Sequence, residues 1–185
     1  MRLGTTARWS TIIPHGMRVD SPYAGVVGFA PGDRLIQPTM IGGGHVLDAM
    51  RRGLRHIGVD PVATRRLVGG RADGPVVLCP LASSESKEWT GWSALVAGLD
   101  RIGVSWELQV SGAVEALRDQ LAGARVVVGL DSGPLHLADA MGVPVVGVFT
   151  STSTLRFSAV GGKSLQNPSP TTAMGALASV LSEAA

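Results

Sequence analysis

The sequence is poor in cysteine and in aromatic residues, and each shortage excludes a class of protein. A single cysteine, Cys79, rules out a disulfide framework and fits a reducing cytoplasm. It lies in the apolar run VVLCPLA, where we expect a buried structural thiol and not a nucleophile. Aromatic residues make up 4% of the chain, and they do not interleave with the arginines. This pattern argues against a nucleic-acid partner.

Long hydrophobic runs are also missing. The opening sequence MRLGTTARWSTIIPHG lacks the apolar stretch of a signal peptide. No segment approaches the roughly 18 consecutive apolar residues of a membrane span. The sequence therefore predicts a cytoplasmic protein.

Charge is scarce and unevenly placed. Charged residues make up 16% of the chain, against a usual share of about 25%. Residues 1–71 hold ten arginines and four aspartates, a net charge of +6, whereas residues 72–185 have a net charge of −4. The arginines are scattered, which is typical of solvated surface residues. Binding of an anionic small molecule or a lipid headgroup near the N-terminal part is the alternative.

Strand and helix patterns alternate from residue 75 to the end of the chain. Short apolar runs predict strands at 75–82, 104–110, 125–130 and 143–149. Helical spacing predicts helices at 91–103, 112–124, 134–142 and 171–185. Their alternation predicts an α/β fold with a Rossmann-like, mostly parallel sheet.

Residues 1–74 are less regular. AGVVGFA (24–30) is compatible with a strand, and HVLDAMRRGLRHIG (45–58) favours a helix. We place a boundary in residues 60–74, which gives a partial N-terminal segment (1–74) and a Rossmann-like domain (75–185).

The clearest chemical signal is the tripeptide Asp131-Ser132-Gly133, between a predicted strand and a predicted helix. Ligands of open parallel sheets bind beyond the carboxyl ends of the strands. Ser132 can cap the helix, Gly133 lets a ligand approach the backbone, and Pro134 suits the first helical turn. Helix amides at this position attract phosphate, and His136 can bond a phosphate or sugar oxygen. The turn therefore predicts a site for a phosphorylated ligand, although plain capping and a surface histidine explain the same residues.

The whole stretch VVVGLDSGPLHLADAMGVPVVGVF (126–149) resembles the signature of glycosyltransferase family nine, the ADP-heptose:lipopolysaccharide heptosyltransferases. That signature is an apolar strand, Asp-Ser/Thr-Gly, two residues, His-Leu, a small-residue helix, Gly-x-Pro and another strand. PVVLCPLASSESKEWTGWSALVAGL (75–99) likewise resembles the first strand, loop and helix of the family's C-terminal domain.

The resemblance implies the donor-binding half of a B-type glycosyltransferase fold. It implies an ADP-sugar as donor substrate, with no metal or other cofactor, and a lipopolysaccharide-type glycolipid acceptor met at the inner face of the membrane. Two groups of residues would contact the donor: Ser83, Ser84 and Lys87 its phosphates or sugar, and Asp131, Ser132, Gly133 and His136 its diphosphate and nucleoside.

The sequence also departs from the family. Only the C-terminal domain is recognisable, and His45 lies near a position where the family carries a histidine. The acceptor loop with the acidic catalytic base has no counterpart, so the catalytic residue is unknown. A segment that bears an acidic residue for the ribose is missing between residues 110 and 112. The family's Phe-Gly-Pro-Thr is replaced by Phe-Thr-Ser-Thr at 149–152.

Several interpretations compete with a transferase. An α/β-hydrolase would use Asp131 as a nucleophile, but His136 is too close in sequence to serve as its distant histidine. Gly162-Lys163-Ser164 ends like a P-loop, but Phe157 stands where the first glycine belongs. The main alternative is a non-catalytic, truncated nucleotide-sugar-binding domain without an acceptor half. A domain that works beside a separate acceptor domain, or as a homo-oligomer, also fits.

Overall fold

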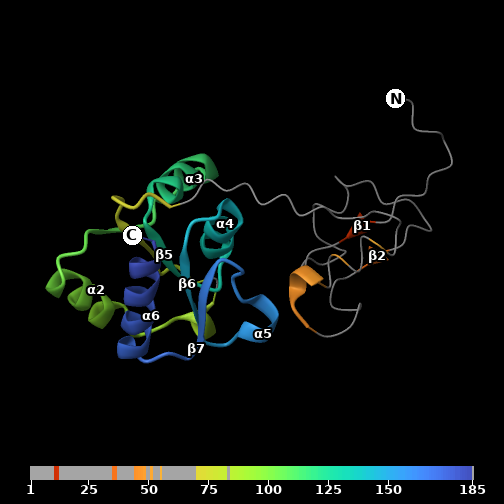
Figure 1. Cartoon of the computed structure of the whole chain (residues 1–185). Helices are drawn as coiled ribbons and strands as arrows, with labels where there is room; N and C mark the ends of the chain where they lie inside the picture. The colour runs from red at the N-terminus through yellow and green to blue at the C-terminus, as the bar shows by residue number, and fades with distance from the viewer. Residues whose placement is uncertain are drawn as a thin grey trace. The chain divides into compact units, whose positions relative to one another are not determined.

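The protein is described here from a computed structural model of the whole chain (Figure 1). It describes residues 70–82 and 84–184, together with residues 11–12, 35–36, 44–48, 51 and 55. The chain divides into two compact units, Met1–Ala63 and Thr64–Ala185.

In the first unit, strands β1 (Thr11–Ile12) and β2 (Leu35–Ile36) form a parallel pair. Residues 46–48, 51 and 55 are helical, inside the range 45–58 for which the sequence predicts a helix. The strand predicted at 24–30 lies outside the described residues.

The second unit is a five-stranded, fully parallel sheet in the order β4-β3-β5-β6-β7. This arrangement confirms the predicted Rossmann-like α/β fold. The strands are β3 (Val76–Cys79), β4 (Trp106–Leu108), β5 (Val126–Leu130), β6 (Val145–Phe149) and β7 (Gly162–Gln166). The helices are the 3-10 turn η2 (Glu85–Lys87), α2 (Trp92–Arg101), α3 (Val114–Gly123), α4 (Gly133–Met141), α5 (Thr154–Phe157) and α6 (Pro170–Glu183).

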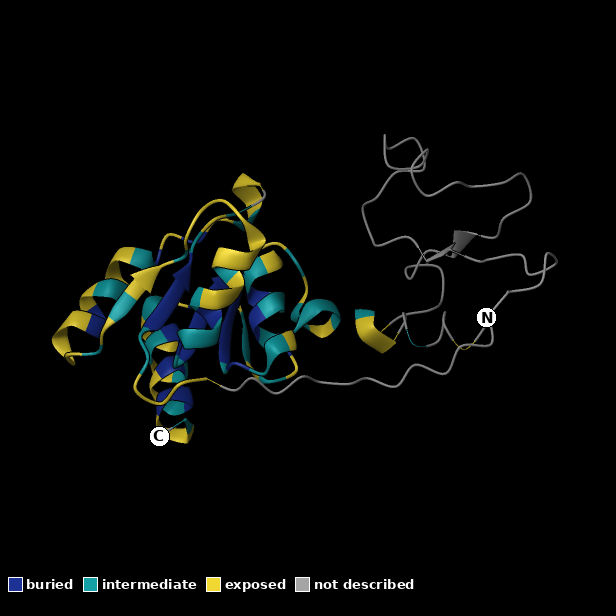
Figure 2. Cartoon of the chain, turned by 90° about the horizontal axis from the view of Figure 1, so that it is seen from above, coloured by how far each residue is buried: buried dark blue, intermediate teal, exposed yellow. Residues whose placement is uncertain are grey.

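Helices cover both faces of this sheet. One hydrophobic cluster joins the sheet to α2 and α6, and a second joins the opposite face to α3 and α4. In Figure 2 the buried strands lie between helices whose outer faces are exposed. Every residue of β3, β5 and β6 is buried, because strands covered on both faces need apolar side chains on both. Cys79 is one of these residues, and burial raises its pKa to about 12, which confirms a structural thiol.

The helix ends differ in detail from the sequence pattern. Gly103 has a φ of +67° just beyond α2 and stops that helix, as predicted. Ile102 is 52% exposed and Val114 is 66% exposed. Both belong to the apolar pattern of their helices, but they lie at the helix ends, beyond the sheet. Helical spacing identified the right face and overestimated how much of it is buried.

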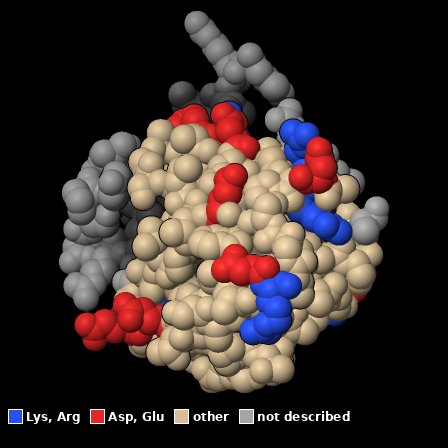
Figure 3. All heavy atoms as spheres, turned by 90° about the vertical axis from the view of Figure 1, so that its left-hand side faces the viewer, with Lys and Arg blue, Asp and Glu red and all other residues tan. Residues whose placement is uncertain are grey.

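Charged side chains on the face in Figure 3 are interspersed, with uncharged surface between them. Within the described part of the chain, no helix is both long enough and apolar enough to cross a bilayer.

Candidate functional site at the carboxyl edge of the sheet

The order of the strands creates a switch point between β3 and β5. The chain runs from β3 outward to β4, and then returns to β5 on the other side of β3. The two connections that follow β3 and β5 therefore diverge at the carboxyl ends of these strands, and ligands of open α/β sheets bind at such a switch point. The turn η2 follows β3, and Asp131 directly follows β5. The topology thus brings the two predicted groups of site residues to one edge of the sheet.

Asp131 is the hub of this edge. Lys87 Nζ donates to the Asp131 main-chain oxygen at 3.0 Å and to its Oδ2 at 3.1 Å. His136 Nε2 lies 2.8 Å from Asp131 Oδ1. The side chains of Asp131, Lys87 and His136 are 8%, 23% and 42% exposed. The carboxylate is therefore buried between two groups that still reach solvent.

These partners keep Asp131 ionised. Burial alone raises the pKa of its carboxyl, but hydrogen bonds from His136 and Lys87, the nearby Thr152 hydroxyl and the charge of Lys87 outweigh burial and hold the pKa at about 2. Thr152 helps to lower the pKa of Asp131, although its hydroxyl makes no hydrogen bond with any described residue. A buried charge is costly unless it is paired and hydrogen-bonded, and Asp131 meets that condition.

The ionised Asp131 carboxylate determines which polar atoms of Lys87 and His136 remain free to bind a ligand. Because it can only accept, His136 must donate through Nε2–H. The ring's second nitrogen, Nδ1, bonds no residue in the described part of the chain. The ammonium of Lys87 has three N–H donors, and the bonds to Asp131 use two of them. One donor on Lys87 and one ring nitrogen on His136 are therefore available at this edge.

Ser132 does not cap α4, although it occupies the N-cap position. Its hydroxyl donates backward to the Leu130 carbonyl at 3.3 Å, so the expected cap is wrong. The first amides of a helix have no partner within the helix. Without a side-chain cap they remain free for another acceptor, and the positive end of the helix dipole favours an anion there.

Gly133 is exposed at the start of α4. A Cβ atom built on it would meet nothing within 4 Å. Gly147, in the middle of β6, differs because a Cβ there would lie 2.7 Å from the Phe149 ring. Packing inside the protein therefore explains Gly147 and does not explain Gly133. The open space over Gly133 fits a backbone that a ligand can approach.

The predicted serines after β3 are only partly placed. Ser84 is exposed and precedes η2, where its main-chain oxygen accepts from Lys87 N at 3.0 Å. Its hydroxyl lies 3.1 Å from that of Ser86. Ser83 lies outside the described residues. The structure therefore brings Lys87, Asp131 and His136 into contact.

Trp89 and Trp92 follow η2 in the chain and pack against each other. Their rings meet edge to face with centroids 5.2 Å apart. The Trp89 indole N–H donates to the Pro168 carbonyl at 2.9 Å.

The loop after β6 also belongs to this edge, although the sequence pattern does not single it out. Thr150 Oγ1 donates to the Ser86 carbonyl at 3.0 Å, and Thr152 lies close enough to Asp131 to lower its pKa. The position of these threonines in the sequence could have indicated a site, because both come within three residues after a buried strand at the carboxyl edge of a parallel sheet. In the sequence these threonines stand out only as a departure from a family pattern.

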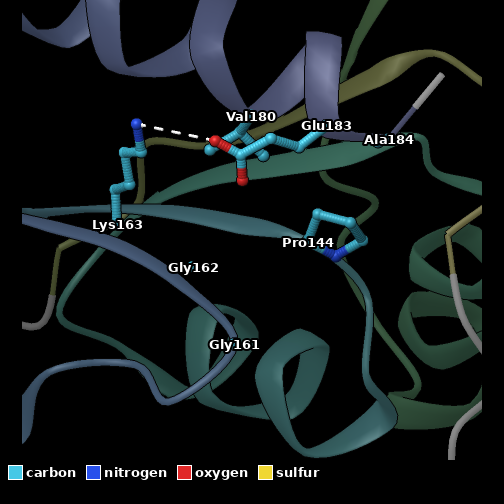
Figure 4. Close-up of a pocket in the computed structure, with 7 residues that line it drawn as sticks. All are labelled: Pro144, Gly161, Gly162, Lys163, Val180, Glu183 and Ala184. Carbon is cyan, nitrogen blue, oxygen red and sulfur yellow. Dashed lines mark ion pairs between the residues drawn. The ribbon is translucent and has the colours of Figure 1, made fainter.

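A cavity of about 360 Å³ lies at the opposite edge of the sheet (Figure 4). Pro144 precedes β6, Gly162 begins β7, and both line it. Lys163 and Glu183 form its ion pair at 3.9 Å. The cavity therefore lies at the amino ends of β6 and β7, and it contains none of the predicted site residues. Since Gly162-Lys163-Ser164 is part of strand β7, it is not a phosphate-binding loop.

The described residues contain no group of three or more His, Cys, Asp or Glu that could hold a metal ion. Asp131 is already bonded to Lys87 and His136, and its low pKa makes it a weak nucleophile. Its arrangement is that of a buried carboxylate that positions two donors.

The family model of Glycosyltransferase family 9 (heptosyltransferase) matches residues 113–178. These residues run from the start of α3 into α6 and include the turn at Asp131. This segment is similar to glycosyltransferase family 9. The resemblance seen in the sequence is therefore confirmed.

Two solved heptosyltransferase structures share the fold of this chain. The structure of E. coli heptosyltransferase WaaC with ADP aligns with a TM-score of 0.54 and 19% identity, over 82% of this chain and 60% of that chain. WaaC with ADP-2-deoxy-2-fluoro heptose gives the same TM-score and identity, over 82% of this chain and 59% of that chain. This chain thus spans about three-fifths of the length of these structures. No curated protein matches the sequence.

Proposed function

We propose that the edge formed by Lys87, Asp131 and His136 binds the diphosphate of an ADP-activated sugar. The observation that carries the proposal is the buried Asp131 carboxylate, which holds Lys87 at 3.1 Å and His136 at 2.8 Å beside an uncapped helix N-terminus. The Lys87 ammonium and a helix dipole at one place suit a ligand with several negative oxygens. His136 adds a second donor, Nδ1–H, when its ring is protonated. The solved relatives bind ADP and an ADP-heptose analogue, which supports this ligand class.

We further propose glycosyl transfer from an ADP-heptose or a similar sugar to a lipopolysaccharide-type acceptor. In a direct displacement, the bond between the sugar and the diphosphate breaks as the acceptor oxygen attacks. Negative charge then grows on the leaving diphosphate, where the Lys87 ammonium and the first amides of α4 stabilise it. The base that takes the acceptor proton comes from outside residues 113–178 in this proposal.

Binding is tested first, by titrating ADP and an ADP-sugar calorimetrically into the whole chain. We expect Lys87→Ala and His136→Ala each to weaken the affinity about tenfold or more, since a hydrogen bond to a charged group contributes about 1.5–3 kcal/mol. The chain has only two lysines, so Lys163→Ala at the opposite edge is the matched control. Its affinity should be unchanged. If the wild-type chain binds neither ligand, or if both site variants bind as well as it does, the proposed site is wrong.

Turnover is tested separately, as ADP released from ADP-heptose with a lipopolysaccharide-type glycolipid as acceptor. Release that depends on the acceptor and on Lys87 supports the transferase. Binding without release supports the non-catalytic nucleotide-sugar-binding domain, and rejects catalysis by this chain alone.

A further inference from the structure

The turn η2 carries Lys87 but is held by few contacts. It is three residues long, and none of them is buried. Apolar packing therefore does not fix its position. Two hydrogen-bonded links join it to the carboxyl edge of the sheet. Lys87 bonds Asp131 at the end of β5, and the Ser86 carbonyl accepts from Thr150 Oγ1 after the end of β6.

The backbone that presents Thr150 is well fixed. The preceding residue, Phe149, is fully buried. Its carbonyl accepts from Asn167 N at 2.8 Å and from Gln166 Nε2 at 3.2 Å. Thr150 therefore starts from the rigid end of a central strand, and its hydroxyl reaches a turn 64 residues away in sequence. Such a support limits where the exposed turn can move.

We propose that Thr150 is a positioning residue of the donor site, whose hydroxyl holds the η2 turn so that Lys87 stays on Asp131 before a ligand arrives. The inference rests on the proposed function for its ligand, a nucleoside diphosphate. It adds a residue that lies outside the predicted site and that does not itself contact the ligand. Glycine, which the family pattern has at this place, carries no hydroxyl for such a bond.

The consequence is preorganisation. A lysine on a loose turn loses side-chain and backbone freedom when it binds phosphate, and that loss weakens affinity. With η2 tied to both β5 and β6, much of this freedom is already lost in the free protein. Thr152, two residues further along, helps to lower the pKa of Asp131, the other member of the pair. One loop thereby supports both Lys87 and Asp131.

The test compares Thr150→Val, which removes the hydroxyl and keeps the shape, with Thr150→Ser, which keeps the hydroxyl. Calorimetric titration with ADP should show Thr150→Val binding about three- to tenfold more weakly, as expected for one neutral hydrogen bond. Thr150→Ser should bind within about twofold of the wild type. In a Lys87→Ala background, Thr150→Val should have no further effect, because Thr150 acts through Lys87. A purely structural role would instead give the same loss in both backgrounds, together with a lower melting temperature.

A second measurement does not depend on ADP. Hydrogen exchange, followed by NMR in the free protein, should be faster at the amides of Lys87 and Glu88 in Thr150→Val and unchanged in Thr150→Ser. If wild-type protein fails to bind ADP, the proposed function falls, and exchange alone decides the role of Thr150. Unchanged exchange in Thr150→Val, or an equal affinity loss with and without Lys87, would overturn the inference.

Discussion

The two edges of the parallel sheet each carry a lysine paired with a carboxylate, and the pairs are built differently. At the carboxyl edge Lys87 lies 3.1 Å from Asp131, with side chains 23% and 8% exposed. At the amino edge Lys163 lies 3.9 Å from Glu183, with side chains 39% and 68% exposed. Only the first pair is desolvated, and only its carboxylate has a histidine as a second partner.

This difference separates a surface contact from a site. An exposed ion pair contributes about 0–1 kcal/mol and is easily exchanged for water. A buried carboxylate is retained only where its partners compensate for lost hydration, and removal of one partner is then strongly destabilising. Perturbed ionisation in a crevice at a topological switch point is typical of functional sites. The cavity at the amino edge, which Lys163 and Glu183 line, lacks these properties.

The largest difference between the two edges is expected when each carboxylate is removed in turn. Asp131→Ala leaves Lys87 without its charged partner, and we expect a loss of about 3 kcal/mol in the free energy of unfolding. Glu183→Ala should change it by less than about 0.5 kcal/mol. Urea denaturation of the two variants and the wild type measures both values. Equal losses would mean that the edges do not differ in energy.

Acid should weaken the carboxyl edge selectively. The pKa of Asp131 is lowered from 3.8 to about 2, so the folded state binds its proton less readily than the unfolded chain. The stabilisation is complete above pH 4 and is lost as pH falls from about 4 to 2. It amounts to about 2 kcal/mol, less than in Asp131→Ala because the neutral carboxyl still packs.

The measurement is the unfolding free energy between pH 5 and pH 2, for the wild type and for Asp131→Asn. The asparagine variant should show a shallower decline, by about 2 kcal/mol over this range. Parallel curves would show that Asp131 titrates normally.

Much of this fold could be predicted from the sequence, because strands buried on both faces need continuous apolar runs. VVLC, VVVGL and VVGVF mark β3, β5 and β6 for that reason. Strand β7 (GKSLQ) was missed, since an edge strand is only partly buried and lacks such a run. Its pairing is set by β6, a tertiary effect that local pattern does not encode.

For the candidate site, the sequence led to the proximity of Lys87 and Asp131 only through the family resemblance, which implies that both contact one donor. The choice of hydrogen-bond partner was not predictable. Ser132 bonds Leu130 instead of capping α4, and Thr150 bonds Ser86 across 64 residues. Both depend on where neighbouring elements come to lie. The assignment of all seven predicted residues to the donor stays a prediction: Ser83, Ser84, Lys87, Asp131, Ser132, Gly133 and His136.

Gly133 offers the smallest and most selective test of the carboxyl edge. A Cβ there meets no protein atom within 4 Å, so Gly133→Ala should fold as well as the wild type or slightly better, since alanine favours a helix. If a diphosphate lies against this backbone, the added methyl group should still weaken ADP binding, by about tenfold for a loss near 1.4 kcal/mol. Gly147→Ala is the opposite control, because its Cβ would lie 2.7 Å from Phe149 and should cost about 1–3 kcal/mol of stability. Melting temperatures and ADP titrations of both variants separate the two roles. A Gly133→Ala variant with normal melting and normal affinity would remove the reason for placing the diphosphate at this turn.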